Sequence, residues 1–204
     1  MTRRLLPVAL VALSLLSACS ILPKSEPLDI YLLPSQTLPL KAAPSMDGVS
    51  LRINKAQANQ LLDSTRIAVV NQQNQISAYK GARWSDRAPL LLRDRLIEAF
   101  SQDAKLAAVS SDSNNLQADL ELVMDLRAFQ SEYRDGQVQA HVLLDVQLVE
   151  GDTQRILSSQ RFNVRQAATS SAVPAVVQSL GLATDELSRQ LVNWTQQQAH
   201  LRSH

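Results

Sequence analysis

The residue with the clearest chemistry is Cys19, the only cysteine in the 204-residue chain. Two arginines precede an apolar run over residues 5–16, and Leu16-Ser17-Ala18 stands directly before the cysteine. A short basic region, an apolar run and small residues before a cleavage point are typical of a secretory signal. With cysteine in the next position, the pattern matches the bacterial lipobox, in which the thiol is acylated and the preceding bond is cut. The alternative is an ordinary signal peptide that ends by chance at a cysteine.

The lipobox predicts a signal peptide over residues 1–18, a mature chain that begins at Cys19, and a short tether over 19–28. Cys19 would carry an S-diacylglycerol group and an N-acyl chain such as palmitate. One acyl chain binds a membrane only marginally, whereas several anchor it stably. Ser20 rather than aspartate follows, which resembles an outer-membrane sorting signal, so we expect a protein anchored at the periplasmic face of the outer membrane.

The other reactive side chains give no pattern of catalysis or of metal binding. His141 falls on the polar face of a predicted strand, where we expect a solvated side chain rather than a general base, and His200 and His204 fall in a terminal tail over 200–204. Five glycines are too few for a phosphate-binding loop, and one cysteine excludes a Cys-rich metal site. We therefore predict no catalytic, metal or cofactor-binding residues, and hence no enzyme. Twenty basic against nineteen acidic residues make nucleic acid an unsuitable partner.

The hydropathy pattern predicts an α+β fold, a mostly antiparallel sheet with two amphipathic helices packed on one face, in a single domain over residues 29–199. Alternating apolar residues predict two long strands, from 116 and from 138, joined by a turn at Asp135-Gly136. Facing charges favour the register that places Arg127 opposite Asp145; the other register places Asp125 there. Further strands are expected at 29–33, 49–53, 66–72, 75–80, 106–109 and 156–164, and helices at 86–102 and 173–198.

Two groups of side chains are candidates for contact with a partner. The outward face of the long strands carries more apolar residues than water requires, so it could dock another protein, bind lipid, or be covered by the proline-containing segment 34–48. Trp84 is either a core residue beneath the first helix, which we favour, or an exposed anchor. The candidate docking residues are Trp84, Val123, Phe129, Leu143 and Val149. On the helices, we expect Arg95 and Asp185 to face water, and a kink or a close contact at Gly181.

Short motifs in a fixed order carry a family resemblance. They are Tyr31-Leu32-Leu33-Pro34 after the lipobox, Leu51-Arg52-Ile53, Leu62-Asp63 before Arg66-Ile67, Ala82-Arg83-Trp84-Ser85-Asp86 and Pro89-Leu90-Leu91. Together they resemble the ABC-type transport auxiliary lipoproteins of the PqiC/YmbA type, over about residues 29–197. The resemblance implies a partnership with a periplasmic MCE-domain protein and, indirectly, with an ABC permease and ATPase that move lipids between two membranes and maintain membrane integrity. It assigns a role to Cys19 alone, as the acylation site.

The sequence is also compatible with other functions. An outer-membrane lipoprotein could instead activate a cell-wall synthase, although nine residues after Cys19 span at most about 30 Å and make a short leash for that task. A periplasmic hydrolase with an unrecognised site is a further alternative. The sequence also leaves open whether the domain itself carries phospholipid and whether it forms a homo-oligomer.

Replacement of Cys19 tests the lipobox. Cys19→Ala removes the thiol that would be acylated, so we expect the variant to lose labelling by an alkyne-tagged palmitate and to disappear from the outer-membrane fraction. Because Cys19 is the only cysteine in the chain, no other thiol can be acylated in its place. Retention of the variant at the outer membrane would contradict the lipoprotein assignment.

Overall fold

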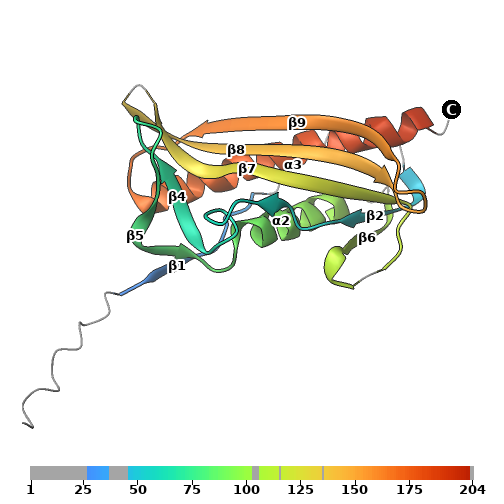
Figure 1. Cartoon of the computed structure of the whole chain (residues 1–204), viewed down its shortest axis with the longest axis horizontal. Coiled ribbons are helices and arrows are strands. Elements are labelled where there is room, and N and C mark those ends of the chain that lie inside the picture. Colours follow the sequence, from blue (N-terminus) through green and yellow to red (C-terminus); the bar gives the residue numbers. More distant parts are fainter. Residues whose placement is uncertain (1–26, 37–45, 103–105, 115, 135, 203–204) are drawn as a thin grey trace, which may run out of the picture.

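The computed structural model describes residues 27–36, 46–102, 106–114, 116–134 and 136–202. The strands and helices lie close to where the sequence places them, and the α+β class is confirmed (Figure 1). In chain order the elements are β1 (Asp29–Tyr31), β2 (Met46–Ile53), β3 (Gln57–Ala58), β4 (Arg66–Val70), β5 (Ile76–Trp84), α2 (Ala88–Gln102), β6 (Leu106–Ser111), η2 (Asp112–Asn114), β7 (Leu120–Arg134), β8 (Gln137–Glu150), β9 (Ile156–Ala167) and α3 (Val173–Arg202).

The strands form one nine-stranded sheet with β7 at its centre. Along one edge β7 pairs with β8, which pairs with β9, and both pairings are antiparallel. Along its other edge β7 pairs in turn with β2, β3 and β4, all parallel to it. Strand β6 extends the sheet beyond β2, and β5 and β1 extend it beyond β4. The long antiparallel hairpin is as predicted, whereas sequence periodicity gave no sign of the short parallel pairings.

A bulge at Arg127 changes the register of the β7–β8 hairpin. Before it, Asp125 pairs with Asp145 and Leu126 with Leu144; after it, Ala128 pairs with Leu143 and Phe129 with Val142. The predicted register, with Arg127 directly opposite Asp145, is therefore wrong. Because successive side chains of a strand point to opposite faces, one extra residue exchanges the faces of every later side chain in β7. Phe129 consequently points into the core, where its ring centroid lies 5.8 Å from that of Trp84.

Both helices pack against the same face of the sheet (Figure 1). The core contains Leu92, Leu96 and Phe100 from α2 and, from α3, a stripe of buried residues at helical spacing that packs on β8 and β9: Val176, Leu180, Ala183, Leu187, Leu191 and Trp194. The Trp194 ring lies edge-on to that of Phe162 on β9, with 5.7 Å between the centroids. The predicted helices and their apolar stripes are thus confirmed.

A buried ion pair joins the two helices to the segment after β1. Arg95 on α2 donates from Nε to the Asp185 carboxylate on α3 at 2.7 Å, and both side chains are buried. The backbone of Gln36 completes the site, because its N–H donates to Asp185 at 2.8 Å and its carbonyl accepts from Arg95 at 3.1 Å. The expectation that Arg95 and Asp185 face water is wrong. Their charges are satisfied by one another, by the backbone of Gln36 and by Glu98, which accepts from Arg95 at 2.7 Å, rather than by solvent.

Gly181 lies where the same segment crosses α3. A Cβ at this position would sit 2.6 Å from the Pro34 carbonyl oxygen, so glycine permits the close approach that the sequence left open. Residues 34–36 therefore pack on the helices, and residues 46–53 form β2 within the sheet. Neither part covers the outward sheet face; residues 37–45 lie outside the described part of the chain.

Substitution at Asp185 tests the ion pair. Asp185→Asn keeps the shape but removes the buried counter-charge of Arg95 and leaves the half-exposed Glu98, 2.7 Å away, as its carboxylate partner. We expect a loss of about 2 kcal/mol of unfolding free energy, as for a hydrogen bond to a charged group. Urea unfolding followed by tryptophan fluorescence measures it, since Trp84 and Trp194 are both buried.

The matched control is Glu186→Gln at the next position. Glu186 pairs with Arg189 near the surface, so its loss should cost less than about 1 kcal/mol. Equal, small losses in the two variants would show that the buried pair does not hold the helices together.

Candidate interaction surface

The face of β7, β8 and β9 that points away from the helices is open along its length (Figure 1). Odd-numbered residues of β8 point outward here and even-numbered ones point into the core, as the burial pattern of the strand shows. Of the five candidate docking residues, two lie on this surface. Val123 is 38% exposed and Leu143 is half-buried.

The other three candidate docking residues are buried, which corrects the prediction. Trp84 lies under α2 against Phe129, so the favoured alternative of a core residue is confirmed. Phe129 is turned into the core by the bulge at Arg127. Val149 is buried on its strand between Glu121 of β7 and Ile156 of β9, and none of the three can contact a partner in the folded chain.

A row of charges crosses the middle of the outward face. Arg161 on β9 donates two hydrogen bonds to Asp145 on β8, at 2.6 and 2.8 Å, and Arg127 on β7 donates a third at 3.1 Å. Arg127 also lies 3.6 Å from Asp125, so the two aspartates that face one another are bridged by arginine rather than free to act as an acid–base pair. A shallow depression of about 320 Å³ beside this row is lined by Val123, Gln147, Ser159 and the charged groups.

The arginines determine the acidity of Asp145. Hydrogen bonds from Arg161 lower its pKa most, slight burial opposes them, and hydrogen bonds from Arg127 add to the effect. The pKa falls from 3.8 to about 2. Asp145 is therefore ionised at every physiological pH and presents a fixed, paired charge.

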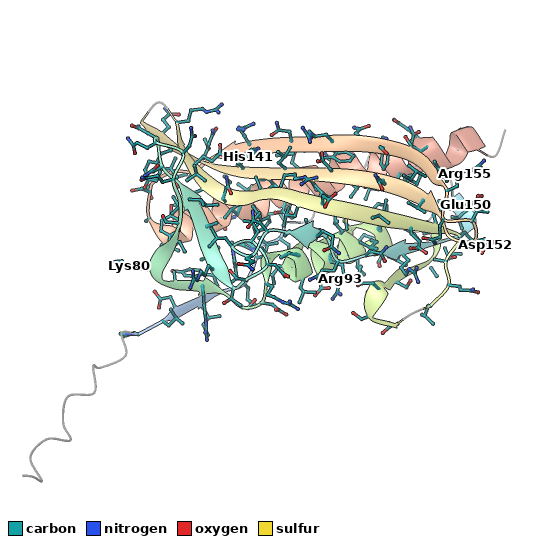
Figure 2. The ribbon with its side chains drawn as sticks, viewed as in Figure 1. Lys80, Arg93, His141, Glu150, Asp152 and Arg155 are labelled. Carbon is teal, nitrogen blue, oxygen red and sulfur yellow. The ribbon has the colours of Figure 1, made fainter. Side chains whose placement is uncertain are left out.

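His141 lies on the outward face towards the turn of the β7–β8 hairpin, and only 6% of it is exposed (Figure 2). Its Nδ1 lies 2.5 Å from a carboxylate oxygen of Glu132, and its Nε2 lies 3.0 Å from the Asn163 side-chain oxygen. The Asn163 oxygen also accepts from Arg165, which approaches Nδ1 as well. The expectation of a solvated histidine is wrong: the ring links β7, β8 and β9, and both of its nitrogens are engaged.

Glu132 is the acidic member of that network. Burial raises its pKa, but the hydrogen bond and charge of His141, together with Gln130 and Arg165, lower it further, so that the net shift is downward. An ionised carboxylate thus balances the arginine and histidine around it. With no nucleophile in the network and both ring nitrogens occupied, the cluster resembles a structural network rather than a catalytic one.

A buried carboxylate lies at the opposite end of the outward face. Glu121 on β7 accepts hydrogen bonds from Arg52 of β2, from Asn54 at 3.3 Å and from Gln154 at 3.2 Å. Burial raises the pKa of Glu121, and these three donors outweigh it and lower the pKa overall. This cluster was not predicted, because its members are up to 102 positions apart in the sequence and meet only through the parallel β2–β7 pairing.

An exposed apolar row at β1 was also not predicted; it is formed by Ile30 on the strand and by Leu28 and Leu32 beside it. Their alternate spacing is visible in the sequence, but the same spacing describes a buried strand face. Only the position of β1 at the edge of the sheet exposes them.

In the described part of the chain, no three His, Cys, Asp or Glu side chains converge to form a metal site. None of the described helices is long and apolar enough to cross a membrane. The lipobox and Cys19 lie outside the described residues.

The chain is similar to a known protein family and to proteins of known structure. Residues 31–192 match the family model of the ABC-type transport auxiliary lipoprotein component. The crystal structure of protein XCC0632 from Xanthomonas campestris superposes with a TM-score of 0.80 at 28% identity, over 85% of this chain and 98% of that one. An uncharacterized protein of known structure shares the fold, with a TM-score of 0.66 at 15% identity, over 83% of this chain and 99% of that one.

A sequence relative, the uncharacterized protein bll6063 from Bradyrhizobium diazoefficiens, is 24% identical over 140 residues. The match covers 65% of this chain but 38% of that protein, so this chain spans well under half of the relative's length.

The row of charges on the outward face predicts a pH-dependent stability. Because the folded pKa of Asp145 lies below its ordinary value, the ionised group stabilises the fold fully above pH 3.8, and this contribution is lost as the pH falls towards 2. We expect a lower urea midpoint for Asp145→Asn than for wild type at neutral pH, and a difference that has largely disappeared near pH 2.

Asp125→Asn provides the control, since the one ion pair of Asp125 among the described residues is the 3.6 Å contact to Arg127. Its midpoint should stay near that of wild type across the same range. A gap between wild type and Asp145→Asn that persists unchanged at the acid end would mean that the arginine pairs do not act through the ionised carboxylate.

Proposed function

The chain belongs to the ABC-type transport auxiliary lipoproteins, and from this we propose that it is an outer-membrane-anchored, periplasmic, non-catalytic subunit of an MCE/ABC system that moves lipids between two membranes. In this role it docks on an MCE-domain protein and contacts the ABC permease and ATPase only indirectly. Through lipid transport it contributes to membrane integrity.

The observation that carries the proposal is the extent of the family match. Residues 31–192 run from the end of β1 through most of α3 and include the core of both helices and of all the long strands. The lipobox at Cys19 adds a sequence argument for an anchor ahead of this domain. An anchored domain with a family role beside a transporter fits a docking subunit.

The outward face of β7–β9 is the surface that we propose for docking. It combines an exposed apolar side chain, Val123, with the fixed charges of Asp145 and Arg161 around a shallow depression. Protein interfaces typically combine an apolar contact with a polar, hydrogen-bonding rim. The carboxylates and the histidine on this face are held by arginines or by one another, which supports a non-catalytic role.

Co-purification tests the proposal. The tagged, full-length chain is isolated from gently solubilised envelopes, and proteins and lipids are identified by mass spectrometry. We expect an MCE-domain protein in the wild-type sample. Val123→Glu places an unpaired charge in the interface and should reduce its recovery at least about tenfold.

Ile76→Glu is the matched control, because Ile76 is an exposed aliphatic residue on β5, a strand that β4 separates from β7. It should retain the partner at the wild-type level. Recovery of a cell-wall synthase in place of any MCE-domain protein would overturn the proposal, and equal losses in both variants would remove the docking face from it.

A further inference from the structure

The row of aliphatic side chains on β1 is the most exposed apolar feature near the start of the described chain. Leu28, Ile30 and Leu32 are 46%, 58% and 75% exposed, while the intervening Tyr31 packs against the core. Alternate residues of an extended segment point to the same side, so the three side chains form one ridge. Three large aliphatic groups in a continuous row mark a contact site more often than isolated ones do.

Two arginines continue this row across the sheet. Ile30 pairs with Arg83 on β5, and Arg83 pairs with Arg66 on β4, so that one line of paired residues leads from aliphatic to guanidinium groups. Both arginine side chains are exposed, and neither forms an ion pair or a side-chain hydrogen bond with any residue in the described part of the chain. Like charges directly opposite one another in a sheet are destabilising. An anion bound between the two guanidinium groups would relieve this repulsion.

The short stretch of chain between Cys19 and β1 limits how far β1 can lie from the expected anchor. Leu28 follows Cys19 by nine positions, so β1 cannot lie farther than about 30 Å from the acylated residue. Strand β1 enters the fold at one end of the molecule, near Lys80, and Arg155 marks the opposite end (Figure 2). The ridge and the two guanidinium groups thus belong to the end of the domain that the tether keeps near the membrane.

We infer that Leu28, Ile30, Leu32, Arg66 and Arg83, which we call the β1 patch, rest on the phospholipid surface that holds the Cys19 acyl chains. The inference depends on the acylation of Cys19 in the proposed function. The aliphatic groups enter the boundary between headgroups and acyl chains, as apolar faces of peripheral proteins do. The guanidinium groups bind lipid phosphates, an anion that arginine matches with two parallel hydrogen bonds. Docked in this way, the domain lies with its β1 end against the lipid, and the end that carries Arg155 points away from the membrane.

A fluorescent probe on the acylated protein tests the contact. In the mature lipoprotein Cys19 is blocked by its lipid, so a single cysteine introduced by Ile30→Cys is the only thiol available for a polarity-sensitive nitrobenzoxadiazole label. The protein is reconstituted into vesicles of phosphatidylethanolamine and phosphatidylglycerol. We expect emission to shift to shorter wavelength and to be quenched by a spin-labelled phospholipid.

Ile156→Cys is the matched control, because Ile156 is also an exposed isoleucine, at 52%, and follows Arg155 at the opposite end of the molecule. Its label should keep an aqueous emission and escape quenching by the spin-labelled lipid. Arg66→Gln and Arg83→Gln together should reduce quenching at position 30.

Each other outcome rejects the β1 patch as a lipid contact. Equal, weak quenching at positions 30 and 156 shows that the domain does not rest on this end. A label at position 30 that is shielded from aqueous iodide but not quenched by lipid assigns the patch to a second copy of the chain. Flotation with the vesicles is scored separately: protein that fails to float contradicts the anchor and thus the proposed function, whereas protein that floats without lipid quenching contradicts the β1 patch alone.

Discussion

The bulge at Arg127 in the central strand determines how the rest of the sheet is used. Before the bulge, β7 contributes Leu122, Met124 and Leu126 to the core; after it, Phe129 takes over that role and meets Trp84 beneath α2. Without the extra residue, Phe129 would point outward and Gln130 inward, where a polar amide would lie in the core unpaired. The same inversion brings Gln130 and Glu132 to the outward face beside His141. One local irregularity thus accounts for both the packed core and the polar network.

Arginine–carboxylate pairs stabilise the chain on both sides of the sheet, but in different ways. On the helix side, Arg95 and Asp185 are buried with the backbone of Gln36, so the pair joins three segments and is largely shielded from water. On the outward side, Asp145 lies between two arginines that are more than half exposed, so salt and water weaken their attraction. Arg66 and Arg83 differ from these arginines, because they face one another and have no carboxylate partner among the described residues.

These features give the domain two distinct ends and one open face. The β1 end lies a few residues from the expected anchor and carries, beside aliphatic groups, two exposed arginines that have no ion-pair partner among the described residues. The outward face of β7–β9 carries charges that are already paired, which suits recognition of a protein surface more than capture of a small ion. A domain held at one end and recognised along one face can link a membrane to a partner without catalysing a reaction. This arrangement is consistent with an auxiliary subunit of a transporter.

The sequence by itself determined the order and type of the elements, because alternation and helical spacing report directly on which residues share a face. Most of the expected strands, both helices and the family were correctly predicted from residues close together in the chain. Tertiary structure decided whatever depended on contacts between distant residues. It buried Arg95 and Asp185, turned Phe129 inward, engaged His141 and left the β1 row exposed. Periodicity states which side of a strand or helix a residue occupies, whereas the neighbour that covers that side comes from another part of the chain, and only the fold brings the two together.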